Sequence, residues 1–347
     1  MTTNKPVIFV TQPILPEGLS ILESIGEVHQ NDRGRPLTED EMVEIATTLD
    51  PDAYVGTFAE PHRVFSARVI EASKRLKVIA WNGLGYDHID PNAATARGIY
   101  VTYVEFHCAT VSDHAFALMI CAARKIVPAA QAVKAGEWER QGTFFNMNFV
   151  GTNIHNRTLG IVGLGRVGGG LARRAFGFDM RILYCDEVPR TALEAQLGVE
   201  RVSFDDLLRQ SDFVCCCVPL TAGTQRMFDA AAFAKMQPSA MFVNVTRGAC
   251  VNTDALYAAL RDRRIEFAAL DVIEPEPLPT DHPILRLDNV LLVPHIAGLT
   301  RETRSQAHII TATDCVRVLQ GYRPKLVLNP AVEKVRPLPE WRGTEAG

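Results

Sequence analysis

The chain has 347 residues, of which 47% are hydrophobic and 22% are charged, and its formal net charge is −4. This composition excludes collagen-like, disordered and mini-protein classes, and the length favours two domains that need neither disulfides nor metals to fold. No basic block is present, so the sequence carries no electrostatic footprint for nucleic acid. We find neither a signal-peptide pattern nor an apolar run long enough to span a membrane, and we expect a cytoplasmic protein.

Over the first hundred residues, short β-branched runs alternate with amphipathic stretches. Strands are expected at 7–10, 53–55, 76–80 and 99–104, and helices at 19–25, 40–48 and 67–73. Alternating strands and helices predict a parallel, doubly wound sheet. A long apolar-periodic segment at 111–135 predicts one or two helices joining two lobes, and a polar, aromatic loop is expected at 136–156.

A second alternating block begins at residue 158. Strands are expected at 159–162, 181–184, 213–218, 241–245, 267–272 and 290–293, and helices at 167–176, 204–210, 230–236 and 253–261. A final helix at about 301–320 precedes a Pro-rich tail. The predicted fold class is therefore α/β, with two doubly wound parallel-sheet domains.

The eight cysteines give no sign of a metal site. There is no Cys-x-x-Cys pair, and Cys215, Cys216 and Cys217 are consecutive within an apolar run. We expect them to be small core residues on a buried strand.

The motif GLGRVG lies between a predicted strand and a predicted helix. Gly163 would allow the tight turn, Gly165 would let the backbone approach a pyrophosphate, and Gly168 would let helix and strand pack closely. Asp186 follows the next predicted strand, where a carboxylate accepts ribose hydroxyls and repels a 2′-phosphate. This pattern predicts dinucleotide binding and favours NAD, although Arg190 nearby could pair with the extra phosphate of NADP.

Three later strands end in polar residues, in the segments MFVNVTRG, LDVIEPEP and LLVPHIAGLT. Open parallel sheets bind their ligands at the carboxyl ends of their strands, so these segments would bring Arg247, Asp271, Glu276 and His295 to one crevice. Taken one at a time, the arginine could be a helix-cap partner, the glutamate a solvated acid and the histidine an ordinary loop residue.

With these motifs, the chain resembles the D-isomer-specific 2-hydroxyacid dehydrogenases, which include glycerate (hydroxypyruvate reductase), phosphoglycerate and D-lactate dehydrogenases. The similarity covers about residues 7–330 and is carried by GLGRVG with Asp186, NVTRGACVN, DVIEPEP and PHIAGLT, together with NGLGYDHID and VSDHAFAL. It implies a flavodoxin-like substrate domain made of residues 1–112 and 300–347. A Rossmann dinucleotide-binding domain, residues 113–299, would be inserted between them.

The resemblance also implies roles for individual residues. Arg247, Glu276 and His295 would be the catalytic set, and the main chain at Gly83, Leu84 and Gly85 would bind the substrate carboxylate together with Arg247 and His295. The expected cofactor-binding residues are Gly163, Gly165, Arg166, Val167, Gly168, Asp186, Val218, Pro219, Thr224, Val245, Thr246, Asp271 and Gly298. Asp271 is expected to contact the nicotinamide carboxamide.

Reduction of a 2-oxo acid needs these residue types. Arg247 can hold the carboxylate and ketone, protonated His295 can neutralise the developing alkoxide, and Glu276 favours the charged imidazolium. We therefore expect a dehydrogenase of short 2-oxo acids such as glyoxylate or hydroxypyruvate, and a homodimer. Two alternatives are an NAD(H)-sensing, corepressor-like protein and an enzyme acting on 3-phosphoglycerate.

The segment before VSDHAFAL departs from the family pattern. Tyr103, Glu105, Phe106 and His107 stand where many members have Asn, Pro and Gly. These residues either pack in the core or form a bulkier, more polar wall of the substrate pocket.

Overall fold

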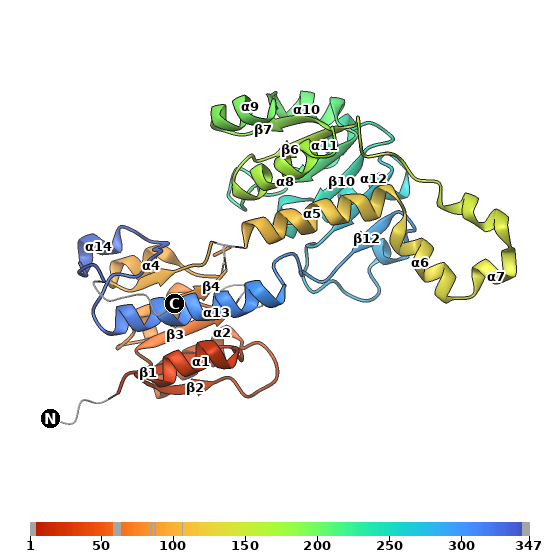
Figure 1. The fold of residues 1–347 in the computed structure, drawn as a ribbon. Coiled ribbons are helices and arrows are strands. Elements are labelled where there is room, and N and C mark those ends of the chain that lie inside the picture. Colours follow the sequence, from red (N-terminus) through yellow and green to blue (C-terminus); the bar gives the residue numbers. More distant parts are fainter. Residues whose placement is uncertain (1–4, 58–63, 84, 87, 106, 342–347) are drawn as a thin grey trace. The chain divides into compact units, whose positions relative to one another are not determined.

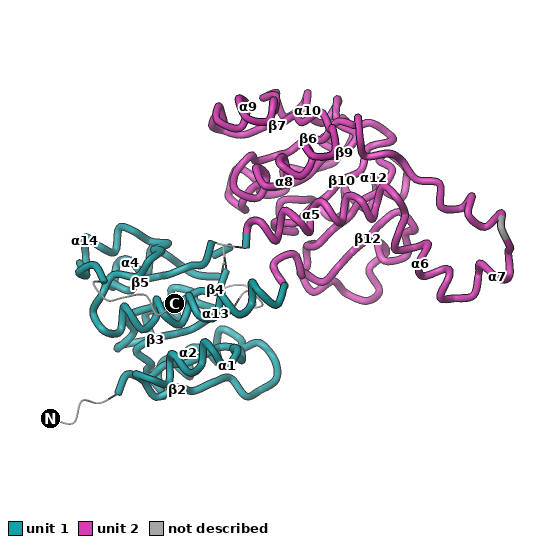
Figure 2. Tube along the Cα trace, viewed as in Figure 1, with its two compact units in different colours: residues 1–107, 300–347 teal, residues 108–299 magenta. Residues whose placement is uncertain are grey.

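The computed structural model describes residues 5–57, 64–83, 85–86, 88–105 and 107–341. The chain divides into two compact units: unit 1 contains residues 1–107 and 300–347, and unit 2 contains residues 108–299 (Figure 2). The first boundary expected from the sequence, 112/113, falls inside helix α5 (Cys108–Ala123). The first turn of α5 belongs to unit 2, because the Ser112 hydroxyl donates to the Val167 carbonyl at 2.8 Å.

Unit 1 is built on a five-stranded sheet with the strand order β2-β1-β3-β4-β5, in which every pair is parallel. Its strands are β1 (Val7–Val10), β2 (Glu27–Gln30), β3 (Ala53–Thr57), β4 (Val78–Asn82) and β5 (Tyr100–Thr102). The order reverses between β1 and β3, as in doubly wound folds of the flavodoxin type.

Helices cover both faces of this sheet. They are α1 (Pro16–Glu23), α2 (Glu39–Thr48), α3 (Ala67–Ala72), α4 (Pro91–Ala96), α13 (Arg301–Leu319) and α14 (Val332–Val335). Leu22 of α1 and Cys315 of α13 pack with Ile8 and Ala80 on one face, while Met42 of α2 and Val69 of α3 belong to the cluster on the other face. The long helix α13, which follows unit 2 in the sequence, is thus part of the core of unit 1 (Figure 1).

Unit 2 contains a seven-stranded parallel sheet with the order β12-β11-β10-β9-β6-β7-β8. Its strands are β6 (Thr158–Val162), β7 (Arg181–Cys185), β8 (Glu200–Arg201), β9 (Phe213–Cys216), β10 (Met241–Asn244), β11 (Phe267–Leu270) and β12 (Val290–Leu292). The order reverses between β6 and β9, which is the point where dinucleotide-binding sheets hold their ligand.

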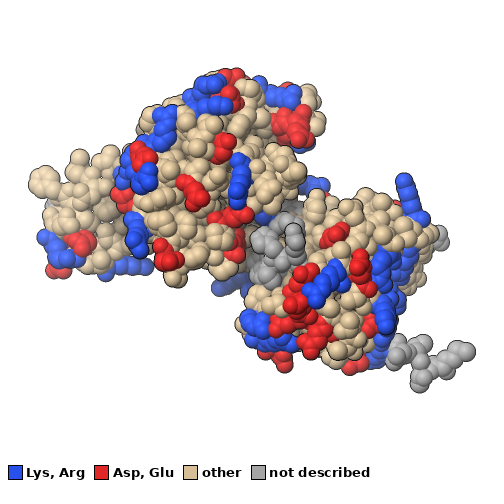
Figure 3. Space-filling model, turned by 180° about the vertical axis from the view of Figure 1, so that it is seen from behind, with Lys and Arg blue, Asp and Glu red and all other residues tan. Residues whose placement is uncertain are grey.

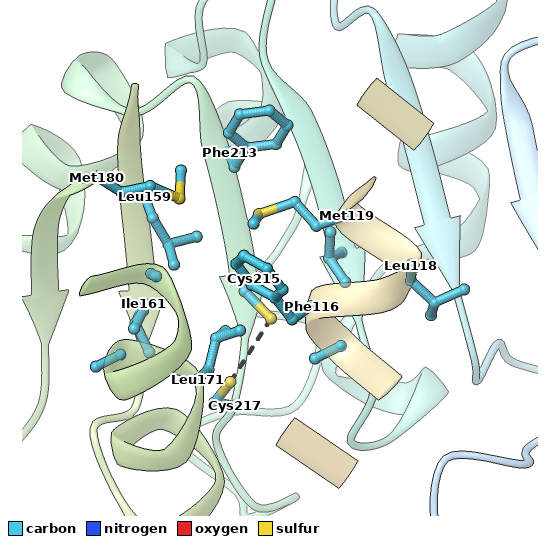
Figure 4. Packing of buried hydrophobic residues seen from close by; sticks show 14 of the residues in the cluster. Phe116, Leu118, Met119, Leu159, Ile161, Leu171, Met180, Phe213, Cys215 and Cys217 are labelled. Carbon is cyan, nitrogen blue, oxygen red and sulfur yellow. Dashed lines mark hydrogen bonds between the residues drawn. The ribbon is translucent and has the colours of Figure 1, made fainter. Parts of the chain in front are cut away.

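Two helical layers enclose the sheet of unit 2. The helices are α5, α8 (Arg166–Phe176), α9 (Thr191–Leu197), α10 (Phe204–Gln210), α11 (Ala230–Lys235) and α12 (Thr253–Arg261), with short 3-10 turns η2 (Gly248–Cys250) and η3 (Pro283–Arg286). Phe116 and Met119 of α5 pack against Leu159, Phe213 and Cys215 of the sheet (Figure 4). The Sγ atoms of Cys215 and Cys217 lie 3.6 Å apart inside this cluster, and both residues are buried.

An arm follows α5, where the sequence predicts a helix ending near 135 and then a loop. The structure forms α6 (Ile126–Lys134), α7 (Glu137–Gln141) and the 3-10 helix η1 (Thr143–Phe149). Figure 1 shows α6 and α7 standing apart from the sheet of unit 2. Among the described residues no single helix is long and apolar enough to cross a membrane, and α5 with α6 meets the length and composition test only as a pair bent by 64°.

Candidate active site

The three glycines of GLGRVG lie between β6 and α8 in three different steric environments. Gly163 has a φ of +93°, and a Cβ there would lie 2.9 Å from the Cys217 carbonyl oxygen. A Cβ on Gly168 would lie 2.2 Å from the Gly163 carbonyl oxygen, so only glycine lets α8 approach the turn this closely. At Gly165, by contrast, the Cβ position is open: beyond the residue's own chain neighbours, no atom of the described residues lies within 4 Å of it. The backbone is therefore open at the helix N-terminus, which suits a pyrophosphate.

Asp186 lies at the end of β7, beside this turn. Its carboxylate accepts hydrogen bonds from the amides of Leu164 at 2.8 Å and Val188 at 3.1 Å, and Arg190 Nη2 lies 3.2 Å from Oδ2. Burial opposes ionisation, but these hydrogen bonds and the guanidinium outweigh it and hold the pKa of Asp186 below its ordinary value. The side chain is thus a fixed anion next to the glycine turn.

The other residues expected at the dinucleotide follow the carboxyl ends of β6, β9, β10 and β12. They are Arg166, Val167, Val218, Pro219, Thr224, Val245, Thr246 and Gly298. The Thr224 hydroxyl donates to the Pro219 carbonyl at 2.6 Å and accepts from the Thr221 amide at 2.8 Å, which closes the turn after β9. The residues after β6 and β9 therefore flank the switch point, and those after β10 and β12 lie further along the same carboxyl edge of the sheet.

Arg247 begins the turn after β10, and a buried asparagine shapes that turn. The Asn244 amide group donates to the Arg247 carbonyl at 2.9 Å, while its oxygen accepts from the Thr246 amide and hydroxyl, each at 3.1 Å. A Cβ on Gly248 would lie 2.1 Å from the Ile273 carbonyl carbon. The arginine turn is consequently packed backbone to backbone against the segment that leads to Glu276.

His295 and Glu276 form a pair. The Nδ1 atom of His295 lies 2.6 Å from Oε1 of Glu276, and both side chains are partly exposed. His295 has a left-handed backbone, with a φ of +52°, and its amide donates to the carbonyls of Asp271 and Val293. The carboxylate orients the ring through Nδ1, so Nε2 is the nitrogen that can exchange a proton with a ligand.

Asp271 fixes the loop that contains His295. Its side chain is buried and accepts hydrogen bonds from the amides of Ile296 at 2.8 Å and Ala297 at 3.1 Å. His114 of α5 places Nε2 3.2 Å from the same carboxylate. In this structure Asp271 is a positioning residue for the loop, and its expected contact with the nicotinamide carboxamide stays a prediction.

The expected substrate loop belongs to unit 1 and follows β4. The Gly83 carbonyl accepts a hydrogen bond from the Val104 amide at 3.4 Å, and the Gly85 carbonyl accepts one from Trp81 Nε1 at 2.7 Å. Leu84 and Phe106 lie outside the described residues. Both glycine carbonyls thus have partners in the unit 1 core.

Two residues, Asn244 and His114, position the site in unit 2 but were not predicted from the sequence. Asn244 ends a buried strand immediately before the arginine turn, and asparagine often folds a turn through its side chain, so this signal was present. The contact between His114 and Asp271 joins residues far apart in the chain, and no local pattern indicates it. Within the described part of the chain no group of three or more potential ligands is arranged to hold a metal ion.

Three features of the parallel sheet in unit 2 define a dinucleotide-dependent oxidoreductase. They are the open glycine turn after β6, the fixed acid Asp186 at the end of β7, and the histidine–carboxylate pair. The comparisons with known proteins agree. Residues 116–297 match the family model of the D-isomer specific 2-hydroxyacid dehydrogenase, NAD binding domain.

Relatives match over nearly the whole length. The chain is 41% identical over 334 residues to the glyoxylate reductase of Korarchaeum cryptofilum, covering 96% of this chain and 98% of the relative. It is 37% identical to glyoxylate/hydroxypyruvate reductase B of Shigella boydii, covering 94% and 99%. The solved NADPH-dependent glyoxylate/hydroxypyruvate reductase of Sinorhizobium meliloti, in complex with NADP and malonate, has a TM-score of 0.81 at 27% identity, covering 98% and 100%. The chain therefore belongs to the D-isomer specific 2-hydroxyacid dehydrogenase family and is an NAD(P)-dependent oxidoreductase of 2-oxo and 2-hydroxy acids.

Proposed function

We propose that this enzyme reduces glyoxylate and hydroxypyruvate, with NADH as the preferred cofactor. The observation that carries the proposal is the 2.6 Å contact between His295 and Glu276, on a segment packed against the Arg247 turn. The names of the relatives support the substrate class, since glyoxylate reductases recur among them.

The residues of the chain have separable tasks. Arg247 binds the carboxylate and carbonyl of the 2-oxo acid through its planar guanidinium. The contact of the substrate carboxylate with the main chain of Gly83, Leu84 and Gly85 stays a prediction from the sequence. The nicotinamide cofactor, when bound, supplies the hydride. His295 donates the proton on Nε2 to the carbonyl oxygen as negative charge develops there, while Glu276 keeps the ring oriented through Nδ1. In the reverse direction the neutral ring accepts that proton.

The preference for NADH rests on Asp186. Its ionised carboxylate stands beside the glycine turn, where it suits the two ribose hydroxyls and repels a 2′-phosphate. Arg190 is already engaged by this carboxylate, which weakens its ability to attract the extra phosphate of NADPH. We expect kcat/KM to be at least tenfold higher with NADH, measured with glyoxylate at one ionic strength.

The proposal is tested by following NADH absorbance with glyoxylate, hydroxypyruvate, pyruvate, phenylpyruvate and 3-phosphohydroxypyruvate. Glyoxylate and hydroxypyruvate should give the highest kcat/KM, and His295→Asn should lower kcat by a factor of about 100 or more while still binding NADH. His282→Asn, in a neighbouring loop, is the matched control and should retain activity. NADH binding without turnover on any acid would contradict the proposal and support the nucleotide-sensing alternative.

We also propose that the enzyme acts as a homodimer joined through the arm of unit 2. The arm carries several exposed apolar side chains: Ile126, Val133, Trp138, Phe144, Met147 and Val150. Phe144 is 89% exposed, which is unusual for a phenylalanine unless another surface covers it. The cytoplasmic location expected from the sequence stays a prediction.

A further inference from the structure

The backbone of His295 has a left-handed conformation that neighbouring groups must hold in place. Its φ of +52° costs free energy in a residue other than glycine, and such a conformation persists only where the surrounding contacts enforce it. Several of these contacts come from Asp271: its carbonyl accepts the His295 amide at 2.9 Å, and its carboxylate accepts the amides of Ile296 and Ala297. The place of the imidazole ring therefore depends on the place of Asp271.

Asp271 is itself held by the sheet and by helix α5. Its amide donates to the Asn244 carbonyl at 2.9 Å, which ties its backbone to the end of β10. Its carboxylate is buried, and Oδ1 lies 3.2 Å from Nε2 of His114 on α5. Because α5 packs against β10 and β11, it brings His114 to the carboxylate from the helical layer. The helix thus reaches the histidine loop through one side chain.

The contact determines which ring nitrogen of His114 carries a proton. Nε2 is buried and makes no hydrogen bond among the described residues, and the carboxylate of Asp271 lies within ion-pair distance of it. An ionised carboxylate only accepts, so an unprotonated Nε2 would place two lone pairs against each other, whereas an N–H there is attracted. Rotation about the broad χ2 torsion of histidine can turn this contact into a hydrogen bond.

We propose that His114 is a positioning residue for the proton transfer: it holds the carboxylate of Asp271 and, through it, the backbone that presents His295. This inference rests on the proposed function, in which His295 donates the proton. Two histidine–carboxylate pairs then serve one reaction, since Glu276 orients the ring and the pair of His114 with Asp271 fixes the loop beneath it. A misplacement of a reacting group by about 1 Å can cost about 100-fold in rate, so loss of the second pair should be measurable.

The test begins with His114→Leu, which fills a similar volume and removes the N–H. We expect kcat for glyoxylate reduction to fall about 10- to 50-fold. KM should change less than about threefold, because the Arg247 turn is held by Asn244 and not by His114. His114→Gln retains an amide N–H near the place of Nε2, and kcat should stay within about threefold of wild type.

Leu118→Ala is the control for a loss of helix packing. Leu118 is buried and lies one turn beyond His114 on the same face of α5. This variant should lower the melting temperature at least as much as His114→Leu, while its kcat stays within about twofold of wild type. Equal losses of kcat in the two variants would assign the effect to helix packing and overturn the inference.

A double-mutant cycle tests whether His114 acts through His295. Once the proton donor has been removed, its position no longer matters, so His114→Leu should lower the residual kcat of His295→Asn by less than about twofold. Losses that multiply in the double variant would overturn the inference. If His295→Asn keeps the wild-type kcat, the proposed function itself fails; if it loses activity and His114→Leu does not, only this inference fails.

Discussion

Glu276 contacts Nδ1 of His295, the ring nitrogen that faces away from the expected substrate, so its contribution is separable from binding. In Glu276→Gln the ring loses the carboxylate that orients Nδ1, and we expect kcat for reduction to fall about 10- to 100-fold. NADH affinity should stay within twofold, measured by quenching of protein fluorescence.

The control for this variant is Glu274→Gln, two residues earlier on the same loop, whose carboxylate lies 4.0 Å from Arg226 and does not contact His295. It should retain activity. Equal losses in both variants would mean that the loop as a whole, and not the histidine–carboxylate pair, limits the reaction.

A substitution at Gly165 should weaken cofactor binding without destabilising the fold. Its φ of −76° suits any residue and its Cβ direction is open, so Gly165→Ala should change the melting temperature by no more than about 2 °C. The added methyl group would occupy the place of the pyrophosphate, and the Kd for NADH should rise at least tenfold, measured by calorimetry. Gly177→Ala, at the other end of α8 and also at negative φ, should leave the Kd unchanged; an unchanged Kd in Gly165→Ala would contradict the assignment of the turn.

Helix α13 contains a histidine, His308, that makes the stability of unit 1 sensitive to acid. His308 is buried, and its Nδ1 accepts the Leu15 amide at 3.0 Å. Burial, reinforced by the charge of Arg304 and by His107 and opposed by Glu17, lowers the pKa of His308 to about 4. The neutral ring therefore contributes stability that is fully present above the unfolded-state pKa of about 6.5 and is lost as the pH falls toward 4.

We expect this histidine to cost about 2 kcal/mol of unfolding free energy between pH 7 and pH 5. His308→Gln, which can still accept the Leu15 amide but does not titrate there, should remove most of that dependence. Urea unfolding at the two pH values measures it, with His155→Gln, an exposed histidine of unit 2, as the control. A wild-type pH dependence that persists in His308→Gln would assign the acid sensitivity to other groups.

Elements that bury continuous apolar runs were predictable from the sequence, and those with weak patterns were not. The strands β6 and β10 are buried at nearly every position and lie where the sequence places them. Strand β2, with the sequence EVHQ, was missed because it is a partly exposed edge strand without apolar alternation. Residues 136–156 of the arm were expected to be a loop because their polar and aromatic composition carries no periodicity, yet α7 and η1 form there.

The residues of the candidate site also fall into those that the sequence predicted and those that it did not. Gly163, Asp186 and His295 were predictable because each belongs to a short motif whose spacing states its chemistry. Asn244 and His114 act through hydrogen bonds or close contacts to backbone and side chains that only the folded chain brings together. Sequence patterns thus indicate candidate ligand-contacting groups better than the groups that hold them in place.

For the molecule as a whole, the distribution of polarity is informative. On the face that Figure 3 shows, Lys and Arg alternate with Asp and Glu over both units. Mixed charge of this kind favours solubility of a small domain and gives no single-sign field. The arm of unit 2 differs from this surface, because it exposes several large apolar side chains, among them Trp138, Phe144 and Met147, beside its charged ones.

If the arm joins two copies of the chain, a charge at its most exposed apolar position should separate them. Phe144→Asp would bring a carboxylate into the contact, and in a two-fold interface the substitution occurs twice, so the penalty is doubled. Sedimentation velocity should show a dimer for wild type and a monomer for Phe144→Asp at micromolar concentration, while Val335→Asp, an exposed valine of unit 1, should stay dimeric. Because the catalytic set is held by contacts within unit 2, the monomer should still bind NADH; a Phe144→Asp protein that sediments as wild type would exclude the arm as the interface.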